Sequence, residues 1–88
     1  MYAVRMLKSA TRDLERLDKA TGRRVVKRLN WLSENLENIT PEELKGNLSG
    51  FYKIRERDYR IIYEILRNEK VIIIHHIGHR RDIYRKRQ

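Results

Sequence analysis

The residues with the richest chemistry lie near the end of the sequence, in residues 77–84 (IGHRRDIY). Here His79 precedes two guanidinium groups, Arg80 and Arg81, and Tyr84 adds a phenol. Imidazole titrates nearest neutral pH and can serve as a base, and arginine can hold a phosphate through two parallel hydrogen bonds. Tyrosine can stack on a nucleobase or donate its hydroxyl. The combination favours a site that handles phosphates.

A second group of cations lies on two consecutive predicted strands. In residues 51–57 (FYKIRER), strand alternation turns three basic side chains to one face: Lys53, Arg55 and Arg57. If the next strand pairs back about a turn at residues 57–58, Arg60 lies near Arg55. Two nearby glutamates could pair with these cations on an ordinary solvated face, but the positive charges outnumber them. We therefore expect a phosphate-facing surface.

The three histidines do not predict a metal centre. His75 and His76 fall inside an apolar strand, where we expect packing, and consecutive strand residues point to opposite faces. No carboxylate cluster completes a ligand set with His79. The absence of cysteine removes disulfides, thiolate zinc sites and a cysteine nucleophile, and suits a reducing cytoplasm.

A strand and two helices are predicted to precede these residues. Residues 2–7 (YAVRML) read as a short strand. Ser9 or Thr11 can cap a first helix, and the pair Thr21-Gly22 is expected to break it. Apolar residues at helical spacing then predict a second helix over residues 23–37, antiparallel to the first.

The second half predicts a helical turn and then a sheet. Residues 40–43 (TPEE) combine an N-cap, a proline at the first helical position and a capping-box glutamate. Residues 51–57, 59–66 and 71–77 read as strands whose short connections require an antiparallel meander. The expected fold is α+β, in the order β-α-α-β-β-β, with two N-terminal helices packed on a small antiparallel sheet. Residues 1–88 are expected to form a single domain.

Charge points to a polyanionic partner. The 88 residues contain 21 Lys+Arg and 12 Asp+Glu, a net charge of +9. Residues 1–44 hold 9 basic and 7 acidic residues (+2), and residues 45–88 hold 12 and 5 (+7), so the excess is concentrated in the second half. A solvated basic surface or an acidic protein partner would explain the charge equally. No apolar stretch reaches 18 residues, so no membrane segment is expected.

Four motifs in order resemble one known family: residues 44–46 (LKG), 52–55 (YKIR), 58–63 (DYRIIY) and 77–84 (IGHRRDIY). Together they are similar to the RelE branch of the RelE/ParE toxin superfamily, the toxin halves of type II toxin–antitoxin systems. The resemblance covers nearly the whole chain and implies a fold like that of microbial ribonucleases, in agreement with the element order above.

The resemblance implies an endoribonuclease that cleaves mRNA in the ribosomal A site without a metal or other cofactor. The ribose 2′-hydroxyl attacks the adjacent phosphate, leaving a cyclic phosphate and a free 5′-hydroxyl. The catalytic positions carried over or considered are Lys53, Arg55, Arg60, His79, Arg80 and Tyr84. RNA-binding positions are expected at Lys45, Arg57, Arg81, Arg85, Lys86 and Arg87.

One departure from the family bears on the general base. Arg55 stands where the best-known members have a lysine, and arginine, which stays protonated, is a poor base. The base is therefore either Lys53, whose cationic neighbours favour the neutral amine, or His79. Lys53 is preferred, because the resemblance supports its position more directly.

Two other functions remain open, and a partner is implied. A ParE-like toxin would inhibit DNA gyrase by protein contact, and a non-catalytic domain would only bind RNA or the ribosome. The resemblance also implies a small, partly acidic antitoxin and a toxin–antitoxin hetero-oligomer that contacts DNA only through the antitoxin. Ribosome and mRNA would be the targets, in the cytoplasm and away from any membrane.

Overall fold

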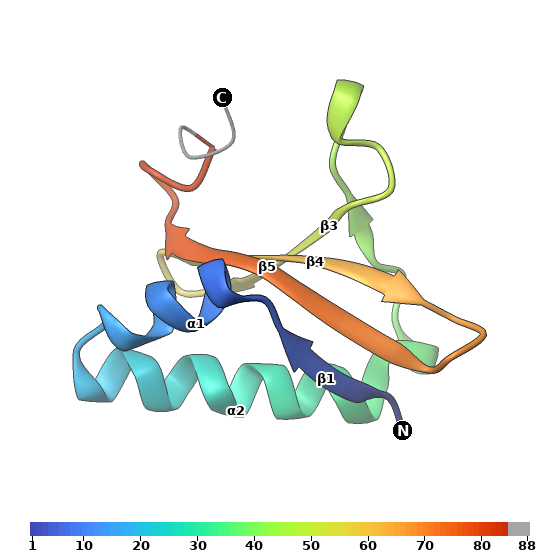
Figure 1. The fold of residues 1–88 in the computed structure, drawn as a ribbon, viewed down its shortest axis with the longest axis horizontal. Coiled ribbons are helices and arrows are strands. Elements are labelled where there is room, and N and C mark those ends of the chain that lie inside the picture. Colours follow the sequence, from blue (N-terminus) through green and yellow to red (C-terminus); the bar gives the residue numbers. More distant parts are fainter. Residues whose placement is uncertain (85–88) are drawn as a thin grey trace.

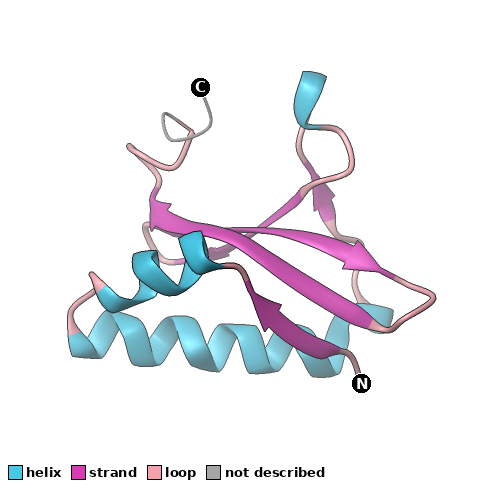
Figure 2. Cartoon of the chain, in the orientation of Figure 1, coloured by secondary structure: helices cyan, strands magenta, loops and turns pink. Residues whose placement is uncertain are grey.

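The computed structural model describes residues 1–84, which form two helices and a five-stranded sheet (Figures 1 and 2). The elements are β1 (Ala3–Met6), α1 (Lys8–Glu15), α2 (Lys19–Asn35), β2 (Glu42–Glu43), β3 (Tyr52–Glu56), β4 (Tyr59–Leu66) and β5 (Val71–His79), with 3₁₀ turns η1 (Leu36–Asn38) and η2 (Gly46–Leu48). The strand order is β1-β5-β4-β3-β2. The predicted α+β class is confirmed and the predicted elements occur in the predicted order, but β2 is an additional strand and the sheet is not entirely antiparallel as predicted. The sheet is mixed, because β1 runs parallel to β5.

The core lies between the helices and one face of the sheet. α2 buries a stripe at helical spacing, formed by Val25, Leu29 and Leu32, and Leu36 extends it into η1. Inward-facing residues of β4 and β5 complete this core: Ile61, Tyr63, Ile72, Ile74 and Ile77. Burial raises the pKa of Tyr63 to about 12. No helix within residues 1–84 is long and apolar enough to cross a bilayer.

α1 covers the part of β5 that β1 leaves open. β1 pairs with β5 only as far as Met6 and Ile74. Beyond that point Ser9 Oγ donates to the His75 carbonyl at 2.7 Å, and Asp13 Oδ2 accepts the Ile77 N–H at 3.0 Å. The helix therefore begins at Lys8 and not after a Ser9 or Thr11 cap, because the Ser9 hydroxyl bonds the sheet edge instead.

The helical hairpin turns four residues earlier than predicted. Asp18 is the N-cap of α2, and its carboxylate accepts the Thr21 N–H at 3.2 Å. Hydrogen bonding to the Thr21 side chain, and then to its backbone N–H, lowers the pKa of Asp18. Gly22 then lies inside the helix, so the expected break at Thr21-Gly22 is wrong. A glycine costs a helix only about 0.5–1 kcal/mol, which capping and core packing outweigh.

The predicted helical turn at residues 40–43 is also wrong, since β2 forms there. Glu42 pairs with Lys53 and Glu43 with Tyr52. The Glu43 carboxylate accepts the Gly50 N–H at 2.9 Å and so does not close a capping box. Pro41 suits this edge equally well, because its fixed φ tolerates extended backbone.

A β-bulge interrupts the pairing of β4 with β5. Ile62 pairs with His76 while the next residue, Tyr63, pairs with Ile74, so His75 is an extra residue. The His75 ring packs edge-on against Phe51 at 4.8 Å and contacts Glu64 Oε1 at 3.0 Å. The His75 ring therefore lies on the sheet face away from the helices, while His76, which pairs with Ile62, contacts Asp13 of α1.

Candidate RNA-cleavage site

The predicted cation cluster forms on the sheet face opposite the helices. Arg55 pairs directly with Arg60, as expected for a turn at residues 57–58, and Lys53 pairs with Ile62. Residues that alternate with these, Tyr52 and Ile54, pack into the helix-side core. Strand alternation thus separates the charged side chains from the apolar ones.

Lys53 lies where three segments meet. Its Nζ is 3.4 Å from Glu42 Oε2 of β2 and 5.8 Å from the ring centroid of Tyr84. The lysine side chain remains 26% exposed, so a ligand can reach it. An amine, a carboxylate and an aromatic ring from distant parts of the sequence therefore converge at one point.

The turn after β5 carries Tyr84 to this point. Ile83 is fully buried in a second small core with Leu44 and Ile62, on the site face of the sheet. Gly78 makes room for it, because a Cβ at position 78 would lie 3.1 Å from Ile83 Cδ1. The Ile83 N–H donates to the His79 carbonyl at 2.9 Å and closes the turn.

The remaining catalytic candidates on this side gather near the β3–β4 turn. Arg60 Nη1 donates to the carbonyls of Arg57 and Tyr59, at 2.9 and 3.0 Å. Arg80 is more exposed, and its Nε lies 3.9 Å from Asp58 Oδ1. Because a strand rises about 3.3 Å per residue, Lys53 and Arg55 lie about 7 Å apart along β3. One RNA strand can contact both groups.

His79 lies on the other side of the sheet. It pairs with Tyr59, and the two rings are 5.5 Å apart in an edge-to-face contact. His79 also lines a depression with α1 residues Asp13 and Arg16. Strict alternation from Ile74 would have put His79 on the Lys53 face, and the extra residue at the bulge reverses it. The structure thus places the two candidate general bases, Lys53 and His79, on opposite faces of the sheet.

The predicted RNA-binding positions are spread around the site. Lys45, Arg57 and Arg81 are exposed. Lys45 flanks η2, whose loop rises from the sheet on the same side as residues 80–84, with the helices on the other side (Figure 2). Arg85, Lys86 and Arg87 lie outside the described residues.

Three side chains beside the site were missed in the sequence. Glu42 was assigned to a helical turn, so its approach to Lys53 could not be foreseen. Arg28 and Trp31 lie one turn apart on α2, and Arg28 Cζ is 4.5 Å from the Trp31 ring centroid. Arg28 Nε donates to the Arg55 carbonyl at 3.0 Å. Their i, i+3 spacing was the available signal.

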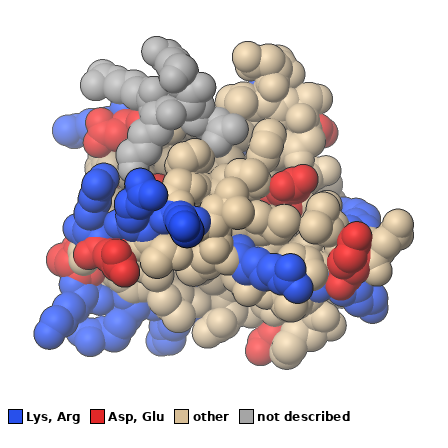
Figure 3. All heavy atoms as spheres, viewed as in Figure 1, with Lys and Arg blue, Asp and Glu red and all other residues tan. Residues whose placement is uncertain are grey.

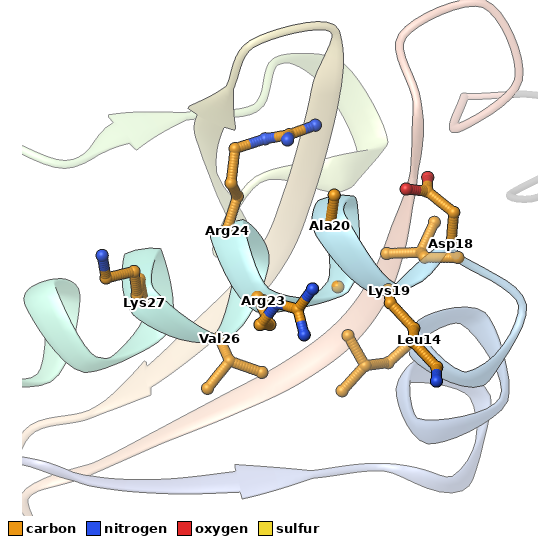
Figure 4. A pocket seen from close by; sticks show the side chains of 10 residues that line it. Leu14, Asp18, Lys19, Ala20, Arg23, Arg24, Val26 and Lys27 are labelled. Carbon is orange, nitrogen blue, oxygen red and sulfur yellow. The ribbon is translucent and has the colours of Figure 1, made fainter.

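A separate depression of about 740 Å³ lies where α1 meets α2 (Figure 4). Leu14 and Val26 point into this space from the two helices. Its basic lining residues are Lys19, Arg23, Arg24 and Lys27. In the view of Figure 3, Lys and Arg side chains gather at this end of the molecule. The positive surface therefore extends well beyond the second half of the sequence, where it was expected to concentrate.

The described residues contain no group of three or more histidine, aspartate or glutamate side chains placed to hold a metal ion. His75 contacts Glu64, and His76 Nδ1 lies 3.7 Å from Asp13 Oδ2, so the two histidines have separate carboxylate neighbours.

The fold and the site define a class of small basic α+β toxins. Residues 4–84 match the family model described as the ParE toxin of the type II toxin–antitoxin system parDE. The chain belongs to this family, within the RelE/ParE superfamily of type II toxins.

Solved structures agree with this assignment. The toxin–antitoxin complex RelBE2 from Mycobacterium tuberculosis matches with a TM-score of 0.80 and 28% identity, over 89% of this chain and 96% of that one. The archaeal RelE–RelB complex from Pyrococcus horikoshii matches with a TM-score of 0.67 and 30% identity, over 90% of this chain and 94% of that one. The isolated Escherichia coli RelE toxin shares the fold with a TM-score of 0.76 and 22% identity, over 99% of this chain and 95% of that one. None of the curated proteins compared by sequence matches this chain.

Proposed function

We propose that this toxin is a ribosome-dependent endoribonuclease that cleaves mRNA in the A site and so inhibits translation in the cytoplasm. The observation that carries the proposal is the position of the Lys53 amine, next to the Tyr84 ring and on the same face as Arg55 and Arg60. Similarity to RelE structures supports the same reading.

The reaction is an attack by the ribose 2′-oxygen on the adjacent phosphorus. Lys53 accepts the 2′-hydroxyl proton while the P–O5′ bond breaks, and water protonates the departing 5′ oxygen, leaving a cyclic phosphate and a 5′-hydroxyl. Arg55, Arg60 and Arg80 stabilise the charge that develops on the phosphate oxygens. Tyr84 stacks on a base of the mRNA and orients the scissile bond.

Replacing Lys53 tests the assignment. In a ribosome-programmed mRNA cleavage assay, Lys53→Ala should cut about 10²- to 10⁴-fold more slowly than the wild type, because it lacks the base. His79→Ala should stay within about threefold, because His79 is on the opposite face. Lys70→Ala, an equal loss of charge in the β4–β5 turn, is the matched control. Full activity of Lys53→Ala would rule out this role.

The family model itself favours a second candidate, inhibition of DNA gyrase by protein contact, since its description is that of a ParE toxin. A supercoiling assay with purified gyrase distinguishes the two. Gyrase inhibition with intact programmed mRNA would replace the ribonuclease proposal. Association with RNA or the ribosome without cleavage would leave only a binding domain.

The partner proposed is a small, partly acidic antitoxin, and the RelBE2 structure named above is a toxin–antitoxin complex. The α1–α2 depression suits an amphipathic segment of such a protein, because apolar Leu14, Leu17 and Val26 lie among four basic residues. In the hetero-oligomer, DNA contact would come only from the antitoxin.

A further inference from the structure

We infer that Arg28 and Trp31 form a second nucleotide subsite, which holds a base of single-stranded RNA beside the one at Lys53. This inference rests on the proposed function, since it takes RNA as the substrate. The subsite is a depression of about 370 Å³, at the lower end of the range for ligand pockets.

The depression is continuous with the proposed cleavage site. Lys53 and Arg55 contribute to its lining from β3, and Arg28 and Trp31 contribute from α2. An RNA strand that contacts Lys53 can therefore continue around the edge of β3 without leaving the protein surface.

The edge of β3 is open here because β2 is short. β2 pairs only with Tyr52 and Lys53, and Pro41, which precedes it, has no N–H to extend the ladder. The Arg55 carbonyl, left without a strand partner on this side, accepts the Arg28 Nε–H instead. This bond holds the guanidinium in place before any ligand arrives.

The side chains suit a base better than a peptide. Arg28 stacks over the Trp31 ring at 4.5 Å, and the tryptophan remains 38% exposed. Indole and guanidinium planes both stack on nucleobases, with little preference among them. Such a flat, preformed surface adds binding without requiring a particular sequence.

The charge of the depression indicates a polyanion. The residues that line it include three cations, Arg28, Lys53 and Arg55, and one carboxylate, that of Glu42. Among the described residues, no carboxylate lies within ion-pair distance of Arg28 or Arg55. The two guanidiniums are therefore available for backbone phosphates on either side of the stacked base.

Trp31 provides the first test, since it is the single tryptophan of the chain. A 2′-O-methyl hexaadenylate, which cannot be cut through its 2′ oxygen, should quench the Trp31 emission on binding. Inorganic polyphosphate should bind without comparable quenching, because it has no base to stack. Unchanged emission at saturating oligonucleotide, or equal quenching by polyphosphate, would overturn the subsite. Quenching by a polyglutamate peptide but not by the oligonucleotide would make this face a protein surface instead.

Oligonucleotide binding and mRNA cleavage by variants give the second test. Trp31→Leu and Arg28→Lys should each bind the labelled oligonucleotide about 5- to 100-fold more weakly, as expected for loss of one stacked base. Each should also raise the KM for ribosome-bound mRNA. Arg12→Lys, the same substitution at an exposed position on α1 away from the subsite, should do neither. Thermal unfolding verifies that the variants fold.

The two proposals fail separately. If wild-type toxin cuts programmed mRNA while Trp31→Leu and Arg28→Lys match Arg12→Lys, the subsite is wrong and the ribonuclease stands. If the oligonucleotide quenches the Trp31 emission and the variants bind it more weakly, but mRNA is never cut, the subsite stands and the proposed ribonuclease activity is wrong.

Discussion

The Lys53 amine lies 3.4 Å from Glu42 Oε2 and 5.8 Å from the centroid of the Tyr84 ring. These neighbours hold the long side chain in one position, so less conformational entropy is lost when a phosphate binds. Arg60 is held in the same way by two backbone carbonyls. The side chains of the proposed site are therefore held in place without a ligand.

For single residues, the sequence predicts which face of the sheet a side chain is on wherever the strand alternates regularly. Lys53, Arg55 and Arg60 share a face because the β3–β4 hairpin is regular. The position of His79 could not be predicted, because one extra residue at His75 reverses every side chain that follows it in β5. Arg28 was missed because its partner, the Arg55 carbonyl, lies 27 positions away in the sequence.

Tyr63 should show the effect of burial on ionisation. Its folded-state pKa of about 12 lies above the ordinary value of 10.0, so the folded protein keeps this proton where the unfolded chain loses it. This contribution to stability is full below pH 10 and is lost as pH rises from 10 toward 12. Denaturant unfolding of Tyr63→Phe should therefore lose less stability than the wild type across this window. Identical curves would contradict the burial effect.

At the scale of elements, the turn after β5 is a separate unit that completes the site. Its anchor, Ile83, packs against Leu44 and Ile62 and not into the helix-side core. A defect in this turn should therefore displace Tyr84 and leave α2 and the main core intact.

Gly78→Val tests this unit. The new side chain would overlap the Ile83 position, since a Cβ alone approaches Ile83 Cδ1 to 3.1 Å. We expect cleavage of programmed mRNA to fall about 10- to 100-fold through mispositioning of Tyr84. Gly22→Ala is the control: no atom lies within 4 Å of its Cβ, so it should leave cleavage unchanged and stabilise α2 by about 0.5–1 kcal/mol. Wild-type cleavage by Gly78→Val would show that the turn is not needed.

The element order can be predicted from local sequence patterns. The predictions that were wrong concern contacts between residues far apart in the sequence. Ser9 reads as a helix cap, but its hydroxyl reaches the His75 carbonyl, 66 positions away. Residues 40–43 carry a strong capping signature, yet pairing with β3 prevails. The parallel pairing of β1 with β5 has no local signal, because only the finished sheet brings the two together.

At the scale of the whole molecule, positive charge serves two surfaces. One is the sheet face with Lys53, and the other is the α1–α2 depression with its four basic residues. Because these surfaces lie on opposite sides of the sheet, an antitoxin segment bound at the helices need not occupy the catalytic groups directly.

Val26→Asp tests this separation. Val26 is exposed and lines the depression, so a carboxylate there should repel an acidic antitoxin segment and weaken the complex about 10-fold or more. Calorimetric titration with the cognate antitoxin measures the change, and mRNA cleavage should be unaltered. Asn47→Asp in η2 is the charge-matched control. Equal affinity of both variants would place the antitoxin elsewhere.

The central position of β5 has a consequence for synthesis. During translation β1 and both helices leave the ribosome long before residues 71–79, yet β5 is the strand on which β1, β4 and α1 all assemble. Contacts between the first and last strands make such folding late and leave apolar surface exposed until then. Under the proposed function, the nascent toxin would not act on the ribosome that is making it, and an antitoxin already present would meet the chain while its helices are still uncovered.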